Sequence, residues 1–352
     1  MSRERLLIAM SGGVDSSAAA HIILSMGFDA LGATMRLVNG LPGNPFEDNT
    51  EAEAARNTCR ILGIEHRTVD LQNEFRHHVV DDFVSVYQDG KTPNPCIVCN
   101  KNIKFGALLD YALSNGCSGI ATGHYARIER DPSGRVLLKK AADSTKDQSY
   151  MLWTLSQSQL SKVRFPLGNM TKKDVRELAH SLGFENAHKK DSQDVCFIPD
   201  GDYASFIEKY SSLTFPCGNY TDLDGNILGK HKGIINYTVG QRKGLGIALG
   251  EPMFVHSKNA ESNTVVLCRD AELFSKRLTA SGINLIACDS LYTPTRLSVK
   301  ARYRHEAAPA TVTQTGEDTL TVEFDEAVRA ISPGQSVVLY DGDCVVGGGF
   351  ID

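Results

Sequence analysis

The sequence lacks several features that would mark a membrane, secreted or disulfide-stabilised protein. Among its 352 residues, no apolar run approaches the roughly 20 residues that a membrane-spanning helix needs. The opening stretch MSRERLLIAMSGG has too short an apolar core for a signal peptide. Nine cysteines are an odd number for a disulfide framework, so catalytic or metal-binding roles for a few of them are the better interpretation. We therefore expect a cytosolic protein of two or three domains.

An excess of positive charge is also absent. The formal net charge of −5 argues weakly against a general polyanion binder. Nucleic acid stays open as a ligand, because local basic patches rather than the total charge make phosphate contacts. Two patches that mix cations with aromatic residues occur late in the chain, HKGIINYTVGQRKGLG and RLSVKARYRH. Taken alone, each is more simply interpreted as a solvated strand face.

Short apolar strands alternate with longer helical segments up to about residue 200. The run RLLIAM is followed by a helix over residues 16–26, and further strands are predicted near 30–37 and 66–71. Such alternation predicts an α/β fold with a doubly wound parallel sheet, whose ligand site lies at the carboxyl ends of the strands. From about residue 278 onward, evenly spaced short strands predict a small β-barrel or sandwich.

A turn rich in glycine and serine, SGGVDSS, follows directly on the first predicted strand. It has neither the G-x-x-x-x-G-K spacing nor the lysine of a Walker loop, and it is not a dinucleotide fingerprint. Gly12 and Gly13 let the backbone approach an anion, and Asp15 can hold Mg²⁺ against phosphates. The plainer alternative is a turn whose serines merely cap the helix. The full run after a buried strand favours phosphate binding at the helix N-terminus.

Two cysteine-bearing stretches differ from the other cysteine contexts. TPNPCIVCNKNIKF, residues 92–105, spaces Cys96 and Cys99 so that two thiols can meet, and KKDSQDVCFIP, residues 189–199, supplies Cys196. Four other cysteines lie in strand-like runs and are expected to be small core residues: Cys117, Cys268, Cys288 and Cys344. That interpretation is weak for Cys96 and Cys99, whose neighbours are polar, proline-rich and typical of a loop.

SGGVDSS resembles the PP-loop signature of ATP pyrophosphatases, enzymes that split ATP into AMP and pyrophosphate while adenylating a substrate. With the cysteine stretches, the resemblance sharpens to the bacterial tRNA 2-thiouridylase family (MnmA type). The motifs that carry it run in family order along essentially the whole chain: SGGVDSS, TPNPCIVCNKNIKF, ATGHYARI, KDQSYML, DSQDVCFIP, YTVGQRKGLG, RYRH and SPGQSVVLY. The expected organisation is a PP-loop catalytic domain over residues 1–205, a central tRNA-contacting domain over 206–275 and a C-terminal β-barrel over 276–352.

The resemblance implies a chemistry. Members of the family replace the C2 oxygen of the wobble uridine by sulfur in tRNAs for Lys, Glu and Gln. A uridine C2 carbonyl is a poor electrophile, so ATP first adenylates its oxygen, while Mg²⁺ and the N–H groups of the loop hold the departing pyrophosphate. The resemblance therefore implies a cytoplasmic, ATP-dependent tRNA sulfurtransferase that is supplied by a sulfur donor or a cysteine desulfurase relay and has no membrane partner.

The same resemblance implies roles for individual residues. The expected ATP-binding positions are Ala9, Met10, Ser11, Gly12, Gly13, Val14, Asp15 and Ser16, with Met35 and Gly123 completing the adenosine pocket. Asn94, Pro95 and Cys96 match the stretch that meets the target base. The other expected tRNA contacts are His124, Lys146, Asp147, Gln148, Arg302, Tyr303 and Gln335.

Sulfur delivery leaves two routes open. The resemblance gives Cys99 the nucleophile position and Cys196 the position that carries a persulfide. We expect the Cys99 thiol to be acidified, because it precedes a helix predicted from about residue 102. Many members have aspartate where this chain has Cys96, and three thiolates can hold three irons of a 4Fe-4S cluster while the fourth iron binds sulfide. We favour this cluster on Cys96, Cys99 and Cys196 over the two-cysteine persulfide route, and both over zinc, which needs four closed ligands.

Two other functions compete with thiolation. A PP-loop ligase that amidates a small molecule with ammonia is disfavoured by the paired cysteines and by the lack of a recognisable glutaminase segment. A nucleotide-sensing or RNA-binding module with a degenerate site is disfavoured by the intact Asp15, Cys99 and Cys196. Release of pyrophosphate from ATP that depends on tRNA would fit only the thiolase.

Overall fold

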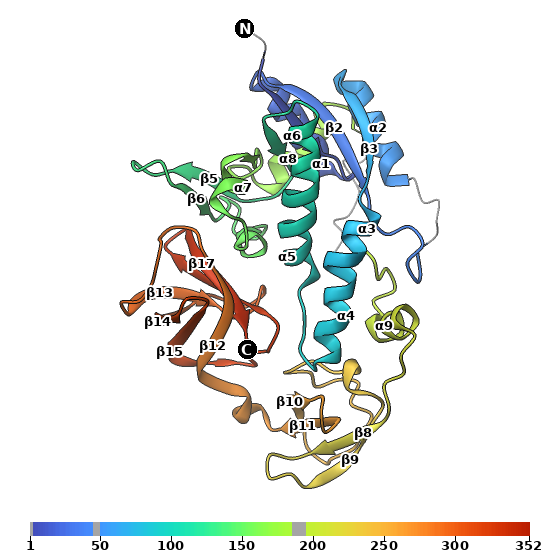
Figure 1. The fold of residues 1–352 in the computed structure, drawn as a ribbon, viewed down its shortest axis with the longest axis vertical. Helices are drawn as coiled ribbons and strands as arrows, with labels where there is room; N and C mark the ends of the chain where they lie inside the picture. Colours follow the sequence, from blue (N-terminus) through green and yellow to red (C-terminus); the bar gives the residue numbers. More distant parts are fainter. Residues whose placement is uncertain (1–2, 45–49, 185–194) are drawn as a thin grey trace. The chain divides into compact units, whose positions relative to one another are not determined.

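The computed structural model describes residues 3–44, 50–184 and 195–352 (Figure 1). The chain divides into two compact units, each assembled from segments that are distant in the sequence. Unit 1 comprises Met1–Val79, Cys96–Pro199 and Asp343–Val345, and unit 2 comprises Val80–Pro95, Asp200–Gly342 and Val346–Asp352. The expected boundaries near residues 205 and 275 stay predictions.

Unit 1 is built on a five-stranded parallel sheet. Its strands are β1 (Arg5–Ala9), β2 (Asp29–Arg36), β3 (Glu65–Asp70), β4 (Gly119–Ala121) and β7 (Val163–Arg164), in the order β3-β2-β1-β4-β7. Leu6, Leu7 and Ile8 of β1 are fully buried, as an apolar run in a central parallel strand requires. The predicted doubly wound sheet is therefore confirmed.

Helices surround this sheet. They are α1 (Val14–Ser25), α2 (Thr50–Leu62), α3 (Gln72–Phe75), the π-helix η1 (Arg76–Val80), α5 (Pro95–Cys99), the π-helix η2 (Asn100–Ala107), α6 (Leu108–Ser114), the 3₁₀ helix η3 (Ser149–Leu152), α7 (Gln157–Ser161) and α8 (Lys172–Ser181). A hairpin of β5 (Arg127–Arg130) and β6 (Val136–Lys139) completes the unit. Small residues let α1 pack on two sides: Ala20 belongs to the core of the sheet, and Ala18 and Ala19 to a second core shared with α8.

One helix begins earlier than the sequence predicts. The stretch around Cys96 and Cys99, interpreted as a loop, is helical from Pro95, and α5, η2 and α6 follow one another without a break to Ser114. Proline is well suited to a first helical position, because the N–H it lacks would have no helical partner there. Cys99 therefore lies inside a helical segment and not in front of one.

Unit 2 holds a small sheet and a barrel. The small sheet has the order β10-β11-β8-β9, from β8 (Gly218–Thr221), β9 (Ile227–His231), β10 (Phe254–Asn259) and β11 (Thr264–Cys268). With it belong α4 (Asp81–Gln88), α9 (Tyr203–Ser211) and the 3₁₀ helices η5 (Ile234–Asn236) and η6 (Asp270–Leu273).

The predicted C-terminal barrel is confirmed, and the sandwich alternative is not (orange to red in Figure 1). Its strands are β12 (Phe274–Leu285), β13 (Thr295–Lys300), β14 (Ala308–Gly316), β15 (Thr319–Arg329), β16 (Ser336–Asp341) and β17 (Cys344–Ile351). They follow the order β12-β15-β14-β13-β16-β17, and β12 also pairs with β17, which closes the barrel. Alternate residues such as Val299, Val312 and Val322 fill its interior.

The order of the parallel sheet defines where a ligand should bind. From β1 the chain crosses to β2 on one side, whereas β4 pairs with β1 on the other. The carboxyl ends of β1 and β4 therefore flank a switch point of the topology, the usual position of a ligand crevice in an open α/β sheet.

Candidate active site at the carboxyl ends of β1 and β4

The turn after β1 carries the glycines of SGGVDSS into this crevice. Gly12 has a φ of +69°, a conformation that favours glycine. Gly13 is the N-cap of α1, and its carbonyl accepts hydrogen bonds from the hydroxyls of Ser16 and Ser17 at 2.9 and 3.1 Å. Gly13 has no side chain to cap the helix. The two serine hydroxyls stabilise the turn instead, through their hydrogen bonds to the Gly13 carbonyl. The positive end of the α1 dipole lies at this turn, as anion binding requires.

Asp15, the expected Mg²⁺ ligand, is paired with a cation of the chain itself. The Lys172 ammonium donates to both carboxylate oxygens, each at 2.8 Å, and the Tyr125 hydroxyl donates to Oδ1 at 2.8 Å. Lys172 is only 8% exposed, and its Nζ lies 5.8 Å from the centre of the Tyr125 ring. Both carboxylate oxygens are engaged, so this arrangement does not fit a magnesium ion unless Lys172 moves.

Packing between helices fixes Lys172 at this place. Lys172 is the first residue of α8, whose N-cap Thr171 forms a capping box with Asp174. The Lys172 N–H also donates to the Asp143 carboxylate at 3.0 Å. The sequence analysis missed Lys172 and Tyr125. The signal that could have found the lysine is a negative one: a phosphate-binding turn without its own lysine needs a cation from elsewhere in the chain.

The turn after β4 closes the crevice from the other side. A Cβ atom at Gly123 would lie 2.8 Å from the Asp15 carbonyl carbon and 2.9 Å from the Ser16 nitrogen, so only glycine permits this approach. Ala9 ends β1, and the half-buried Met35 lies next to the last residue of β2. The structure thus brings the expected ATP positions together at one edge of the sheet, although their roles remain predictions.

The three expected sulfur-handling cysteines lie within electrostatic reach of one another. Cys96 and Cys196 are exposed, Cys99 is buried, and all three are free thiols. Negative charge on Cys99 and on Cys96 raises the pKa of Cys196, and negative charge on Cys96 raises the pKa of Cys99. The first part of the KKDSQDVCFIP motif, residues 189–194, lies outside the described residues.

The thiols are not arranged as a metal site. Within residues 3–44, 50–184 and 195–352, no group of three or more His, Cys, Asp or Glu side chains is placed to hold a metal ion. As they stand, Cys96, Cys99 and Cys196 therefore do not fit the three-thiolate ligand set that an iron-sulfur cluster needs.

The expected acidity of Cys99 is wrong. Burial raises the pKa of the Cys99 thiol to about 11, and Lys104 opposes this rise only in part. Burial is also the largest cause that raises the pKa of Cys196 to about 12, although the residue has exposed surface. Because Cys99 lies inside a helical segment, it gains nothing from a helix N-terminus. Both thiols are protonated at neutral pH in this arrangement.

Alkylation of Cys99 tests this pKa directly. We expect its rate with iodoacetamide to rise about tenfold per pH unit from pH 7 to 10, since the thiolate fraction grows by that factor below the pKa. Peptide mass spectrometry gives the rate for each cysteine. Lys104→Met should slow labelling several-fold, and Lys101→Met, which changes an exposed lysine nearby in the sequence, should not. A plateau near pH 8 would contradict the raised pKa.

The expected tRNA contacts of unit 1 are partly occupied within the protein. Burial and Lys104 hold the pKa of His124 well below its usual value, and its Nδ1 lies 2.6 Å from the Thr122 hydroxyl. A neutral imidazole can hydrogen-bond to a base but does not form an ion pair with a phosphate. Gln148 accepts the Tyr125 N–H at 2.9 Å.

The neighbouring residues of that turn behave in a similar way. The Asp147 carboxylate accepts hydrogen bonds from the Ala141 N–H at 3.0 Å and from the Ser149 hydroxyl at 2.9 Å. The half-buried Lys146 precedes it. Asp147 and Gln148 therefore shape the turn beside Tyr125, and RNA contact by these positions remains a prediction.

Unit 2 holds the remaining expected contacts. Arg302 donates to the Val239 carbonyl at 2.8 Å, and the Lys300 ammonium lies 5.9 Å from the Tyr303 ring centre. The Gln335 amide donates to the carbonyls of Thr92 and Pro93 at 2.8 and 3.1 Å. Gln335 therefore lies beside the chain just before Asn94 and Pro95.

Within the part of the chain that the structure describes, no helix is long and apolar enough to cross a bilayer.

The sequence and its parts are similar to known proteins. Residues 4–200 match the family described as tRNA methyl transferase HUP domain, 204–269 the tRNA methyl transferase PRC-barrel domain, and 275–351 the aminomethyltransferase beta-barrel domain. The tRNA-specific 2-thiouridylase MnmA of Clostridioides difficile is 47% identical over 99% of this chain and 98% of its own. The enzyme of that name from Acetivibrio thermocellus is 46% identical over 100% of both chains.

Solved structures give more distant likenesses. The U34-tRNA thiolase NcsA from Methanococcus maripaludis, with its [4Fe-4S] cluster, has a TM-score of 0.36 at 20% identity over 60% of this chain and 65% of its own. A 4-thiouridine synthetase in complex with RNA and ATP has a TM-score of 0.36 at 17% identity over 59% of this chain and 50% of its own. Likenesses at this level carry no argument about chemistry.

Proposed function

The chain belongs to the tRNA-specific 2-thiouridylase family, and we propose that its crevice adenylates the C2 oxygen of a tRNA uridine and that cysteine-held sulfur then replaces that oxygen. The observation that carries this proposal is the presence, in one unit, of the turn at Gly12 and Gly13 and of three cysteines whose charges influence one another. An amidating ligase would need the turn but not the thiols.

In the first step, the uridine O2 attacks the α-phosphorus of ATP, a new O2–P bond forms, and the bond to pyrophosphate breaks. The backbone of the turn and the α1 N-terminus stabilise the phosphates. Lys172 supplies the cation that SGGVDSS lacks, and its ammonium exchanges the Asp15 carboxylate for phosphate oxygens when ATP enters. Asp15 would then be free to hold Mg²⁺, which neutralises the departing pyrophosphate when bound.

In the second step, sulfur displaces AMP from C2. The terminal sulfur of a Cys196 persulfide attacks C2, and AMP leaves with the former O2. The Cys99 thiolate then attacks the Cys196 sulfur, and the electron pair of the broken S–S bond becomes part of the C=S group. A Cys99–Cys196 disulfide remains, which a thiol reductant must reopen. Since both thiols have raised pKa values here, we expect the bound substrates to change their surroundings before attack.

Cys96 offers the other route for sulfur. We predict from the sequence that Cys96, Cys99 and Cys196 together hold a 4Fe-4S cluster, and this requires the thiols to move from the arrangement described above. We also propose tRNAs for Lys, Glu and Gln as substrates and a separate sulfur donor or desulfurase relay, both from the family resemblance. The cytoplasm is the compartment that such a substrate implies.

Reconstituted thiolation tests the function. Purified protein with ATP, Mg²⁺, a thiol reductant and an unmodified tRNA transcript, kept free of air, should yield 2-thiouridine by nucleoside mass spectrometry. Sulfur is supplied in two parallel arms: as sulfide for the cluster route, and by a cysteine desulfurase with cysteine for the persulfide route, because sulfide cannot form a persulfide without a two-electron oxidant. Pyrophosphate should be released in step with it and only when tRNA is present. If tRNA stays unmodified under every sulfur source supplied, the proposed function is wrong.

The same assay separates the two sulfur routes. After anaerobic reconstitution with iron and sulfide, the cluster route predicts bound iron in the wild type, and loss of both iron and thiolation in Cys96→Ala. The persulfide route predicts no bound iron, full thiolation by Cys96→Ala when a cysteine desulfurase and cysteine supply the sulfur, and no thiolation when sulfide is the sulfur source. Cys217→Ala is the matched control, because Cys217 is exposed and no role is proposed for it.

A further inference from the structure

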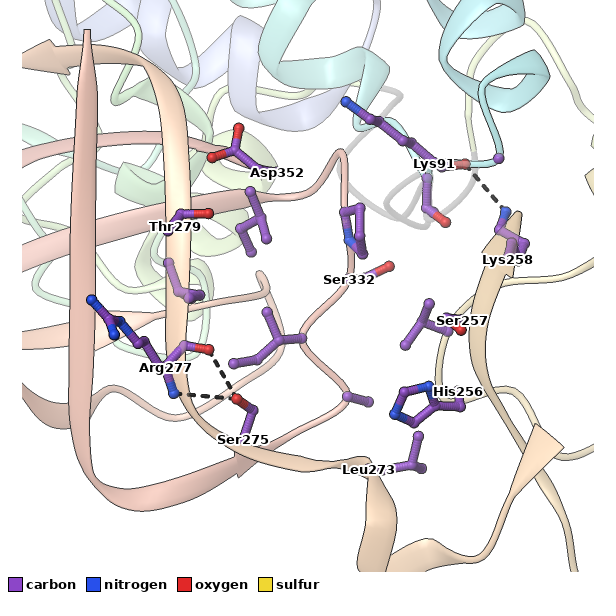
Figure 2. A pocket seen from close by; sticks show the side chains of 18 of the residues that line it. Lys91, His256, Ser257, Lys258, Leu273, Ser275, Arg277, Thr279, Ser332 and Asp352 are labelled. Carbon is purple, nitrogen blue, oxygen red and sulfur yellow. Dashed lines mark hydrogen bonds between the residues drawn. The ribbon is translucent and has the colours of Figure 1, made fainter. Parts of the chain in front are cut away.

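Unit 2 contains a cavity of about 820 Å³ that none of the roles above uses. Residues 89–92, 256–258, 272–275, 277–279 and 330–333 form most of its walls. Figure 2 shows Ser332 between side chains of β12, such as Arg277, and side chains of β10, such as His256. The volume is in the range of small-molecule and cofactor sites.

Three polar atoms in these walls are buried and lack a hydrogen-bond partner among the described residues. They are Thr92 Oγ1, His256 Nδ1 and Ser332 Oγ. Ser332 is 0% exposed and Thr92 is 9% exposed. Leaving such atoms unpaired is costly, so each one in a folded protein needs an explanation. A ligand with hydroxyl or carbonyl groups in the cavity would supply the missing partners.

Two of the three lysines and arginines that line the cavity, Lys91 and Lys258, have no acidic partner among the described residues, whereas Arg277 lies 3.9 Å from Glu323. The exposed Lys91 ammonium has no acidic partner in the described residues, and the Lys258 ammonium donates only to the carbonyls of Tyr237 and Lys91, at 2.7 and 3.3 Å. Figure 2 shows the second of these contacts. Burial lowers the pKa of Lys258 to about 8, which reflects its lack of a counter-charge.

Three carboxylates also line the cavity. Glu272 accepts the Arg269 N–H at 2.8 Å, Asp352 accepts the Ser281 hydroxyl at 2.6 Å, and Asp89 is exposed. Two of the three acids are therefore engaged by groups of the protein, whereas Lys91 and Lys258, two of the three lysines and arginines of the lining, have carbonyl partners or none. This difference favours an anionic ligand.

The cavity also has features that suit an RNA nucleotide. Phe274 lines it with 46% of its surface exposed, and exposed aromatic rings stack on unpaired bases. The Gln335 amide donates a hydrogen bond to the carbonyl of the lining residue Thr92, and Arg302 donates one to the carbonyl of the lining residue Val239. Both are positions at which tRNA contact is expected, so the cavity adjoins them.

We infer that this cavity receives one nucleotide of the tRNA substrate, with its phosphate at Lys91 and its sugar or base edge at Thr92, His256 and Ser332. The inference rests on the proposed function and extends its RNA contact to residues to which the family resemblance gives no role. It assigns the buried hydroxyls to substrate binding and not to folding.

Binding of an unmodified tRNA transcript tests the inference. We expect Lys91→Ala to weaken binding about five- to tenfold and to reduce the slope of log K against log salt by about 0.7–0.9, the loss of one phosphate contact. Ser332→Ala should weaken binding a few-fold without changing the slope, since it removes an uncharged contact. Lys276→Ala is the matched control, because Lys276 lies on β12 next to Arg277 but does not line the cavity.

The outcomes separate this inference from the proposed function. Wild-type affinity and slope in Lys91→Ala and Ser332→Ala, while the wild type thiolates tRNA, would overturn the inference alone. Equal losses in Lys276→Ala would also overturn it, because a general charge effect would explain the data. Saturable binding of uridine monophosphate that Lys91→Ala abolishes, with tRNA binding unchanged, would assign the cavity to a free nucleotide and overturn the RNA assignment. Loss of tRNA binding in both cavity variants supports the inference even if thiolation fails.

Discussion

Replacing Cys99 with serine is expected to abolish thiolation of tRNA, by about 1000-fold or more, while tRNA-dependent release of pyrophosphate continues. The reason is that, in the proposed order of steps, adenylation uses the turn at Gly12 and Gly13, whereas the thiol acts only after the adenylate has formed. A serine hydroxyl ionises far less readily than a thiol and cannot form the disulfide that releases sulfur to C2. Parallel measurement of 2-thiouridine by mass spectrometry and of pyrophosphate by a coupled assay separates the two steps.

Cys117→Ser is the matched control for Cys99→Ser. Cys117 is a buried free thiol just before β4 with no proposed part in the reaction, so this variant should keep both activities. If Cys99→Ser loses pyrophosphate release together with thiolation, the thiol is needed before or during adenylation, and the proposed order of steps is wrong. Thermal midpoints of the two variants show whether either change acts through folding.

Lys172→Met should lower the rate of pyrophosphate release by about 10- to 150-fold, the range for losing a hydrogen bond to a charged group. The neutral side chain can no longer donate hydrogen bonds to phosphate oxygens, so both the affinity for ATP and the turnover should fall. Lys172→Arg, which keeps the charge, should retain a larger share of the activity. The matched control is Lys173→Met, because the next lysine of α8 has 83% of its side chain exposed and pairs with Glu177 at the surface.

A double variant separates phosphate binding from mere neutralisation of Asp15. In Lys172→Met the Asp15 carboxylate loses its cation, and its side chain is only 30% exposed, so part of the effect could come from that unpaired charge. Lys172→Met with Asp15→Asn removes both charges. If the double variant recovers wild-type turnover, Lys172 only balances Asp15, and its proposed contact with phosphate is wrong. If thermal stability recovers and turnover does not, the contact is supported.

Much of the fold could be predicted because it depends on local patterns. Uninterrupted apolar runs such as Leu6–Ile8 are typical of a strand covered on both faces, and alternating buried residues such as Ala310 and Val312 of β14 are typical of a strand with one buried face. The parallel sheet follows from these periodicities, whereas the closure of the barrel is seen only in the pairing of β12 with β17. The helix start at Pro95 was mispredicted. Two prolines with polar neighbours are typical of a loop, but proline is also well suited to the first position of a helix, and the pattern alone does not distinguish the two.

The sequence by itself determined where the glycine turn proposed to bind phosphate lies and which thiols are proposed to handle sulfur, since a glycine turn after a buried strand and closely spaced cysteines are local motifs. Only the tertiary structure decided that Lys172 neutralises Asp15, that Gly123 presses on the same turn, and that Cys99 is less acidic than its position suggested. Charge pairing and desolvation depend on atoms brought together from distant parts of the chain, and the order of residues along one segment does not record which atoms those are.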